Sequence, residues 1–373
     1  MNDYITSYCQ ETRDELITLI TKLCTIPSYS HHELAKAKYI KEWFKQYDIN
    51  AEIDEANNVS VWLNKNKTKD IIVFSAHIDT VFKDETGFKT EIKNNRLYAP
   101  GVGDDTTNVA TLMLIVRYLC RHHKDSNYTL LFVFDACEEG LGNLEGTKYI
   151  VDKYKDNIKE YYSLDLGYDS IINKAVGSTR YRINIKTEGG HSFNAFGNTN
   201  AIAVAAKLIN ELYQYQVPTT SNSTYNVGTI EGGTSVNTIA QDASFLFEYR
   251  SDSQNDLTKM MNDFNKTIQK YQASYNIDVE VIGIRPSMGK VDMEYENRIT
   301  HDVQDIIQKY THHSVKTKSG STDCNVPLSL GIPSLCFGAY LGKDEHTKEE
   351  YVELDSLAIG FKIVMEYIDK YLI

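Results

Sequence analysis

Histidine and acidic side chains follow several apolar, strand-like runs of the sequence. His77 and Asp79 end the run IIVFSAHID (71–79), and residues two apart on a strand project from the same face. A metal-bound imidazole commonly donates its other N–H to a carboxylate, so His-x-Asp can be a metal ligand with the group that orients it. Taken alone, the pattern is more typical of a hydrogen-bonded strand end.

Two adjacent glutamates end another apolar run, FVFDACEEG (132–140). Neighbouring side chains of an extended chain point in different directions, so one of Glu138 and Glu139 could bind a metal while the other acts as a base. A solvated acidic turn is the alternative.

A third acidic group lies in the glycine-rich loop APGVGDDTTN (99–108), directly before a helical pattern. Loop flexibility and the helix N-terminus both suit carboxylates there, although Asp104 or Asp105 could simply cap the helix. Asp165 then ends a strand-like run in SLDLG, and His346 follows the loop FGAYLGKD.

Together these motifs predict one metal site with mixed nitrogen and oxygen ligands. Its expected ligands are His77, Asp105, Glu139, Asp165 and His346. Such a set suits zinc with open positions for water and substrate, and cobalt or manganese can share it.

The hydrophobic pattern indicates the elements that must position these residues. Helical spacing occurs at 13–23, 34–47 and 108–119, and strand-like runs occur at 71–79 and 128–136. Apolar strands linked through helices predict an α/β architecture, with a mixed, largely parallel sheet covered by helices.

The pattern changes from about residue 177, where strand-like runs alternate with two helical segments up to about 287. We therefore expect a smaller α+β domain at 177–287, inserted between the two parts of a catalytic domain at 1–176 and 288–373.

Composition excludes several classes of protein. The 373 residues suggest about two domains, and the net charge of -12 argues against binding to nucleic acid or an anionic membrane. No apolar run reaches the roughly 18 residues that span a bilayer, and no secretory signal is visible. Six cysteines without a C-x-x-C pair favour a reduced, cytoplasmic compartment.

Taken in order, the motifs resemble those of the peptidase T, carboxypeptidase G, aminoacylase and succinyl-diaminopimelate desuccinylase family, nearest to peptidase T-like members. The resemblance covers roughly residues 70–360 and rests on SAHIDTV, GVGDDT, CEEGLGNLEG, GGHSF, GGTSVNTIA, EYRS, STDCNVPLSLGIP and HTKEEY. It implies two divalent metal ions per chain.

The resemblance also implies roles for single residues. Asp105 would bridge the two ions, Glu138 would be the general base, and Asp79 would orient His77. The family usually has Lys-Gly-Gly after its bridging aspartate, whereas residues 106–108 are Thr-Thr-Asn.

The inserted domain would be the family's lid and dimerisation domain. Expected substrate contacts and oxyanion donors are His191, Asn237, Arg250, Arg285, Gly320 and Thr322. An arginine fork suits a carboxylate, and a histidine can donate to a developing oxyanion. Arg250 could instead pair with Glu248 as a cross-strand ion pair.

The implied function is hydrolysis of amide bonds in di- or tripeptides by a water activated between two metal ions, in a homodimer. Alternatives are an N-acyl amino acid deacylase of the same family and a catalytically silent dimeric binding protein. A serine or cysteine hydrolase is disfavoured, because the sequence has no G-x-S-x-G and no obvious base beside Cys137.

Overall fold

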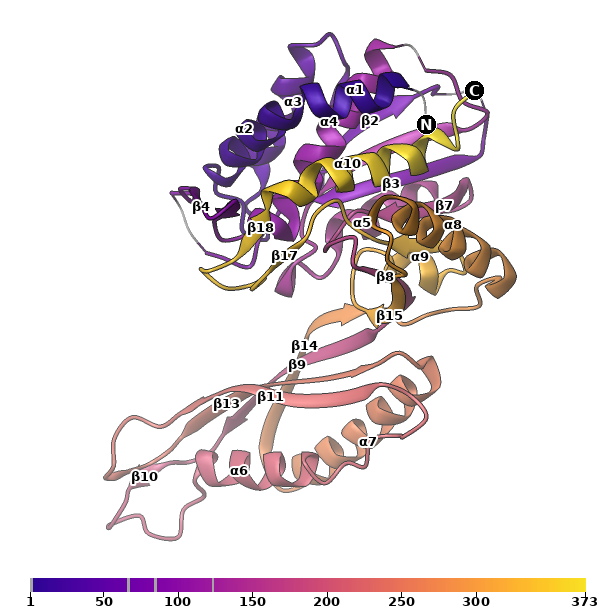
Figure 1. Cartoon of the computed structure of the whole chain (residues 1–373). Coiled ribbons are helices and arrows are strands. Elements are labelled where there is room, and N and C mark those ends of the chain that lie inside the picture. Colours follow the sequence, from indigo (N-terminus) through magenta and orange to yellow (C-terminus); the bar gives the residue numbers. More distant parts are fainter. Residues whose placement is uncertain (1–2, 66–67, 84–85, 123) are drawn as a thin grey trace. The chain divides into compact units, whose positions relative to one another are not determined.

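The chain forms two compact units (Figure 1). The computed structural model describes residues 3–65, 68–83, 86–122 and 124–373. One unit combines the residues up to Ala175 with Lys290–Ile373, and the other is Val176–Gly289.

An eight-stranded sheet forms the centre of the first unit, in the order β1-β2-β6-β3-β7-β16-β8-β15. The strands are β1 (Ala51–Ile53), β2 (Val59–Leu63), β3 (Ile71–His77), β6 (Thr129–Asp135), β7 (Ile158–Ser163), β8 (Ser170–Ala175), β15 (Lys316–Gly320) and β16 (Ser334–Cys336). The neighbours β6, β3, β7 and β16 run parallel, whereas β2 and β8 pair antiparallel with this group. The mixed, largely parallel sheet is therefore confirmed.

Helices cover this sheet, as the complete burial of β3 and β6 requires. They are α1 (Asp3–Glu11), α2 (Arg13–Cys24), α3 (Leu34–Lys45), α4 (Asn108–Arg121), α5 (Glu145–Tyr154), α8 (Met293–Thr311), α9 (Asn325–Ser329) and α10 (Leu354–Asp369). Two short helical turns, η1 (Val102–Thr107) and η2 (Gly140–Gly142), lie in loops. α4 packs on β3 and β6 and is buried from Asn108 to Leu119, because apolar residues occupy nearly its whole circumference.

A small antiparallel sheet joins two distant loops of the first unit. Its order is β17 (Gly342–Lys343), β18 (Tyr351–Glu353), β5 (Arg96–Tyr98) and β4 (Glu91–Lys93). Because Tyr351 pairs with Tyr98, the segment around His346 is held near the acidic loop that begins at Ala99.

The second unit is an antiparallel sheet packed on two helices. Its order is β11 (Ser223–Gly232), β13 (Asp242–Ser251), β9 (Gly177–Lys186) and β14 (Asn276–Arg285), and the helices are α6 (Ala201–Leu212) and α7 (Gln254–Gln272). Alternate residues of β13 are buried, which is the period of a strand with one face on a core. A separate pair, β10 (Gly190–His191) and β12 (Thr238–Ile239), completes the unit.

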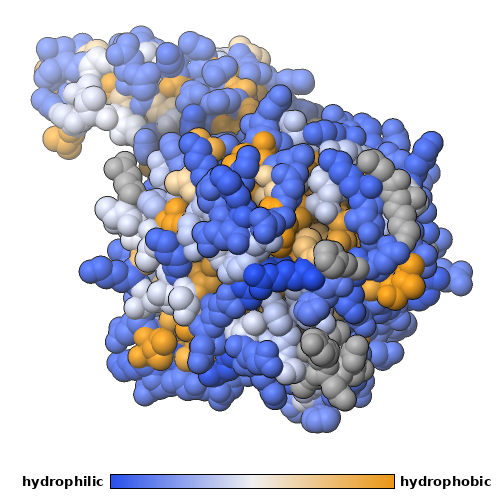
Figure 2. Space-filling model, turned by 90° about the horizontal axis from the view of Figure 1, so that it is seen from above, coloured by the Kyte–Doolittle hydropathy of each residue, from blue (hydrophilic) through white to orange (hydrophobic). Residues whose placement is uncertain are grey.

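The surface is largely polar where it can be seen. On the face drawn in Figure 2, hydrophilic residues predominate and apolar residues lie in small separate groups. Among the described helices, none is both long enough and apolar enough to cross a membrane.

Candidate metal centre

The parallel register of three strands brings the predicted site residues to one edge of the large sheet. Ser75 of β3 pairs with both Val133 of β6 and Ser163 of β7, so these strands end together. The predicted residues at or just beyond these ends are His77, Asp79, Glu138, Glu139 and Asp165. All of them are buried.

His77 directs each of its ring nitrogens at a carboxylate. Nε2 lies 2.9 Å from Oδ1 of Asp104, and Nδ1 lies 3.4 Å from Oδ1 of Asp79. Burial alone would lower the pKa of His77, but hydrogen bonds and charges from these acids raise it well above its usual value. Nε2 is thus the nitrogen open to a metal, and Nδ1 faces the predicted orienting group.

Asp104 lies between two histidines, although it is absent from the predicted ligand set. Its Oδ1 contacts Nε2 of His77 at 2.9 Å, and its Oδ2 contacts Nε2 of His346 at 3.0 Å. Burial would raise the pKa of Asp104, but the two imidazoles lower it below its usual value. Asp104 is thus the aspartate that faces both histidines, and the bridging role predicted for Asp105 stays a prediction.

Asp105 takes a different place in the cluster. Its Oδ2 accepts the backbone N–H of His77 at 3.0 Å, and its Oδ1 accepts the side-chain amide of Asn108 at 2.6 Å. Asp105 also lies near Asp165, so it remains within reach of a metal, but it does not contact His346 in the way Asp104 does.

Glu138 and Glu139 both donate backbone N–H groups to the carboxylate of Asp79. The N–H of Glu138 donates to Oδ1 of Asp79 at 3.0 Å, and the N–H of Glu139 donates to Oδ2 of Asp79 at 2.9 Å. The side chain of Glu139 contacts Nε2 of His346 at 3.1 Å. Asp79 thus fastens the glutamate loop to the strand end that carries His77.

Two further residues support the cluster, and sequence reasoning missed both. The Ser30 hydroxyl lies 2.7 Å from Oδ2 of Asp79 and 3.1 Å from the carbonyl of Glu139. The buried carboxylate of Glu350 accepts backbone N–H groups from Gly101, Gly103 and Asp104 at 2.6–2.9 Å. Glu350 lies four residues after His346, and this spacing is the signal that could have identified it.

The charges of the cluster fit divalent cations. Burial and neighbouring carboxylates raise the pKa of Glu139 and that of Asp165 to about 8, and they raise the pKa of Asp105 well above its usual value. One buried oxygen of Asp165 has no hydrogen-bond partner among the described residues. Carboxylates packed this closely, with histidine nitrogens among them, are the donor set that a divalent cation neutralises.

Two groups of ligand atoms in the cluster are close enough to hold a metal, and each brings its atoms within 4.8 Å of one another. They are His77 with Asp104 and Glu139, and His77 with Asp105 and Asp165. The four predicted ligands His77, Asp105, Glu139 and Asp165 are therefore brought together, with His346 in contact with the first group.

The second unit carries four of the predicted substrate residues. His191 is exposed on β10, and the N–H of Ser192 donates to the carbonyl of Asn237 at 3.0 Å, so His191 and Asn237 lie together at the β10–β12 strand pair. Arg250 on β13 and Arg285 on β14 both pair with Ser178 on β9, the strand between them. The two arginines therefore lie side by side across the sheet, one on each side of Ser178.

An ion pair accompanies this arginine row. Glu248 accepts from Nε and Nη2 of Arg250 at 2.9 and 3.1 Å, and the two residues lie on the same strand rather than on neighbouring strands. Arg180 lies 3.3 Å from Glu248, and burial together with the charges of Arg285 and Arg250 lowers its pKa. Sequence reasoning missed Arg180.

Gly320 and Thr322 lie in the first unit, where both have packing roles. A Cβ at Gly320 would meet Cδ1 of Ile172 at 2.3 Å, so the Ile172 side chain on β8 would have to move to admit a larger residue. Thr322 is buried, and its hydroxyl accepts the N–H of Cys324 at 3.3 Å. Substrate contact by either residue stays a prediction.

Several known proteins resemble this chain over nearly its whole length. A succinyl-diaminopimelate desuccinylase of Blochmanniella floridana is 23% identical over 390 residues, covering 96% of this chain and 100% of that protein. The crystal structure of aminopeptidase PepT from Bacillus cereus superposes with a TM-score of 0.73 at 21% identity, covering 96% of this chain and 98% of that one. A tripeptidase from Staphylococcus aureus gives a TM-score of 0.78 at 21% identity with the same coverage.

An α/β fold of this kind, with a buried cluster of histidines and carboxylates at its strand ends, defines a metal-dependent hydrolase. The family model of peptidase family M20/M25/M40 matches residues 73–370. The chain belongs to this family, and the predicted resemblance and enzyme class are both confirmed.

Proposed function

We propose that this hydrolase cleaves amide bonds of di- or tripeptides and uses two divalent metal ions, with zinc as the first choice. The proposed ligands are His77, Asp104, Asp105, Glu139, Asp165 and His346. The observation that carries the proposal is the position of Asp104, whose two oxygens face two different histidines. A carboxylate in that position can bind one ion through each oxygen.

The chain's own residues provide the proton transfers. When bound, the metal ions would lower the pKa of a water and polarise the substrate carbonyl. Glu138 would accept the proton of that water and return it to the leaving amine. The backbone N–H of Glu138 donates to Asp79 and holds the glutamate beside the cluster. The same carboxylate faces Nδ1 of His77, so Asp79 would position both the base and this ligand.

The second unit offers groups for the rest of the substrate. Arg250, Arg285 and the neighbouring Arg180 suit a substrate carboxylate, because the guanidinium fork matches its geometry. His191 and Asn237 are exposed polar groups that could donate to the oxyanion formed during hydrolysis. Gly320 and Thr322 would contact the substrate as part of the loop in which they lie.

A second candidate activity is deacylation of N-acyl amino acids. The desuccinylase relative, aligned over nearly the whole chain, favours it, and the arginine row suits an acidic acyl group equally well. We further propose a cytoplasmic homodimer, since all six cysteines are free and the two outer strands β11 and β14 of the second unit leave edges for pairing.

Replacing each of the two adjacent aspartates in turn by asparagine tests the proposed metal ligands. Asp104→Asn removes a charge that faces both histidines, so we expect the protein to lose at least one of its two ions and nearly all turnover. Asp105→Asn is the matched control, and we expect it to retain more metal because Asp105 contacts only one of the two histidines. Elemental analysis of both variants decides the point, and equal metal content in Asp104→Asn and wild type would contradict the bridging role.

A substrate screen tests the reaction. Di- and tripeptides and N-acyl amino acids would be compared with added zinc, cobalt or manganese, each with and without a chelator. We expect metal-dependent peptide cleavage, whereas exclusive cleavage of N-acyl amino acids would establish the second candidate instead.

A further inference from the structure

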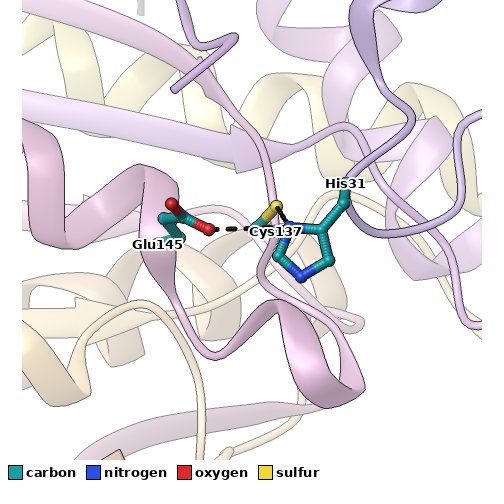
Figure 3. A group of neighbouring side chains, drawn as sticks. All are labelled: His31, Cys137 and Glu145. Atoms are coloured by element: carbon teal, nitrogen blue, oxygen red, sulfur yellow. Dashed lines mark hydrogen bonds and ion pairs between the residues drawn. The ribbon is translucent and has the colours of Figure 1, made fainter. Parts of the chain in front are cut away.

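A second group of potential metal ligands lies outside the cluster described above. Figure 3 shows His31, Cys137 and Glu145, which come from three different segments and turn toward one another. Sγ of Cys137 lies 3.4 Å from Nδ1 of His31, and Nδ1 lies 3.6 Å from Oε2 of Glu145. No base beside Cys137 is recognisable from the sequence, yet His31 lies next to its thiol in the folded chain.

The geometry argues against a catalytic triad of cysteine, histidine and glutamate. In such a triad the histidine uses one nitrogen for the nucleophile and the other for the carboxylate. Here the same nitrogen, Nδ1, faces both Cys137 and Glu145, and the other ring nitrogen points away from them (Figure 3).

Three donor atoms that converge on one point are instead the arrangement of a metal site. Bond lengths typical of zinc place a sulfur and a nitrogen ligand about 3.6 Å apart at the tetrahedral angle, and a nitrogen and an oxygen about 3.3 Å apart. The corresponding separations here are 3.4 and 3.6 Å, and all three atoms lie within 4.8 Å of one another. An ion can therefore enter with small side-chain movements.

The local backbone holds these donors in place. Cys137 has a φ of 61° and His31 a φ of 69°, conformations that cost free energy in residues other than glycine. The N–H of Leu144 donates to the carbonyl of Cys137 at 2.8 Å, which brings the start of α5 and hence Glu145 beside the thiol. Glu33 accepts the N–H of Cys137 at 3.2 Å and fixes this residue from the other side.

Access also fits an exchangeable ion. The side chains of His31 and Glu145 are 53% and 62% exposed, whereas Cys137 is buried. An ion could thus arrive from solution, bind the thiolate at the base of the site and keep a water as its fourth ligand.

We propose that His31, Cys137 and Glu145 bind a third divalent ion of the zinc class, separate from the pair at His77 and His346. Sulfur, nitrogen and carboxylate oxygen together select zinc and cobalt over magnesium or calcium. As the metal–sulfur bond forms, the S–H bond breaks and its proton passes to solvent. Because Cys137 directly precedes Glu138, the ion would brace the loop that carries the proposed base.

Cobalt titration of the purified protein tests this site by a signal that the first cluster cannot give. The ligands proposed for the first cluster are histidines and carboxylates, so they cannot produce a thiolate-to-cobalt charge-transfer absorption, and cysteine variants show which of the six free thiols does. We expect that band to appear as Co²⁺ is added under anaerobic conditions and to disappear with excess Zn²⁺. The result does not depend on any hydrolytic activity.

Variants identify the ligands. Cys137→Ser should abolish the band, and Cys120→Ser, which changes a half-buried cysteine outside the group, should keep it. His31→Ala should weaken cobalt binding by more than about 10-fold, since loss of even an outer partner costs that much, and Glu145→Gln should weaken it as well. His32→Ala is the matched control, because His32 is exposed next to His31 but outside the group.

Two results would overturn the proposal. One is a wild-type protein without the charge-transfer band at saturating cobalt. The other is a band that survives in His31→Ala and Glu145→Gln, whose exposed side chains can change without loss of the fold. His31→Ala and Glu145→Gln also test the proposed site if Cys137→Ser does not fold.

Discussion

At the scale of single residues, Glu138 is the group on which the proposed chemistry depends most directly. Its side chain is buried beside the metal ligands, and its position is set by the backbone bond to Asp79. A glutamine in its place has nearly the same shape but cannot accept a proton from water. We expect Glu138→Gln to keep the metal content and to lose about 10²–10⁴ in kcat, the usual contribution of a general base.

The measurement is steady-state kinetics on the best substrate, with elemental analysis of the same sample. Glu52→Gln serves as the control, because Glu52 is an exposed glutamate of the same unit, in β1. A wild-type kcat in Glu138→Gln would assign the base to another residue.

The ligand set could be predicted from the sequence only in part, and the reason is geometric. Motifs at strand ends identify His77, Glu139 and Asp165, because strand direction determines where those side chains lie. The choice between Asp104 and Asp105 depends on loop torsions that no periodic pattern encodes. Ser30 reaches the cluster from a loop far away in the sequence, so its contacts appear only in the folded chain.

At the scale of elements, the loop after β6 depends on a carboxylate from the end of β3. Asp79 accepts two consecutive backbone N–H groups, those of Glu138 and Glu139. In Asp79→Asn an NH₂ group replaces one of the two acceptor oxygens. This NH₂ group is itself a donor and would face a backbone N–H, so the loop must shift. We expect turnover to fall by about 10–100-fold, as for other partners of metal ligands, with a smaller loss of metal than in a ligand variant.

Turnover and metal content of Asp79→Asn would be measured together. Asp169→Asn, an exposed aspartate that follows β7, is the control. Unchanged kcat in Asp79→Asn would show that the loop keeps its position without this support.

A buried acid on α8 gives a prediction for stability against pH. Glu296 accepts the N–H of Ser334 on β16 at 3.1 Å, and its other oxygen has no partner among the described residues. Burial raises the pKa of Glu296 from 4.5 to about 8. The folded state therefore binds the proton of Glu296 more tightly than the unfolded state does. The free energy of unfolding falls as the pH rises from 4.5, the pKa of this carboxyl in the unfolded chain, to about 8, its pKa in the folded chain.

Glutamine at this position mimics the protonated acid. We expect Glu296→Gln to match the wild type below about pH 4.5 and to unfold at a higher temperature than the wild type above about pH 8. The gain in free energy of unfolding should be on the order of a few kcal/mol at most. Glu294→Gln, an exposed change in the same helix, should show no such dependence, and a pH-independent difference for Glu296→Gln would contradict the argument.

The elements themselves were predictable where a pattern was strong. The apolar runs at 71–79 and 128–136 are β3 and β6, and the pattern at 108–119 is α4. The position of β16 between β7 and β8 has no local signal, because strand order is decided by pairing between distant segments. The same holds for the small sheet that brings the His346 segment to the acidic loop.

At the scale of the whole molecule, the proposed reaction draws on both units. The proposed metal ligands all belong to the first unit, and they come from both of its segments, since His346 follows the inserted second unit. The proposed oxyanion donor, His191, belongs to the second unit. In a homodimer, a complete site could therefore combine ligands of one chain with His191 of the partner subunit or of the same chain.

Mixing two inactive variants distinguishes these arrangements. Glu138→Gln lacks the base and His191→Ala lacks the donor, so each homodimer has no complete site. If His191 acts across the dimer, the mixed dimer contains one complete site, formed by Glu138 of the His191→Ala chain and His191 of the Glu138→Gln chain. Because random exchange makes about half of the dimers mixed, we expect about a quarter of the wild-type activity to return.

Subunit exchange must be measured separately, for example by energy transfer between differently labelled chains, because absent exchange would also give no activity. His191 is exposed and Nδ1 accepts the N–H of Phe193 at 3.2 Å, so its loss should leave the core of the second unit intact. Full exchange without regained activity would place His191 in the site of its own chain. Unimpaired turnover in His191→Ala alone would remove the oxyanion role altogether, and the exposed Asn237 at the same β10–β12 strand pair would then be the next donor to test.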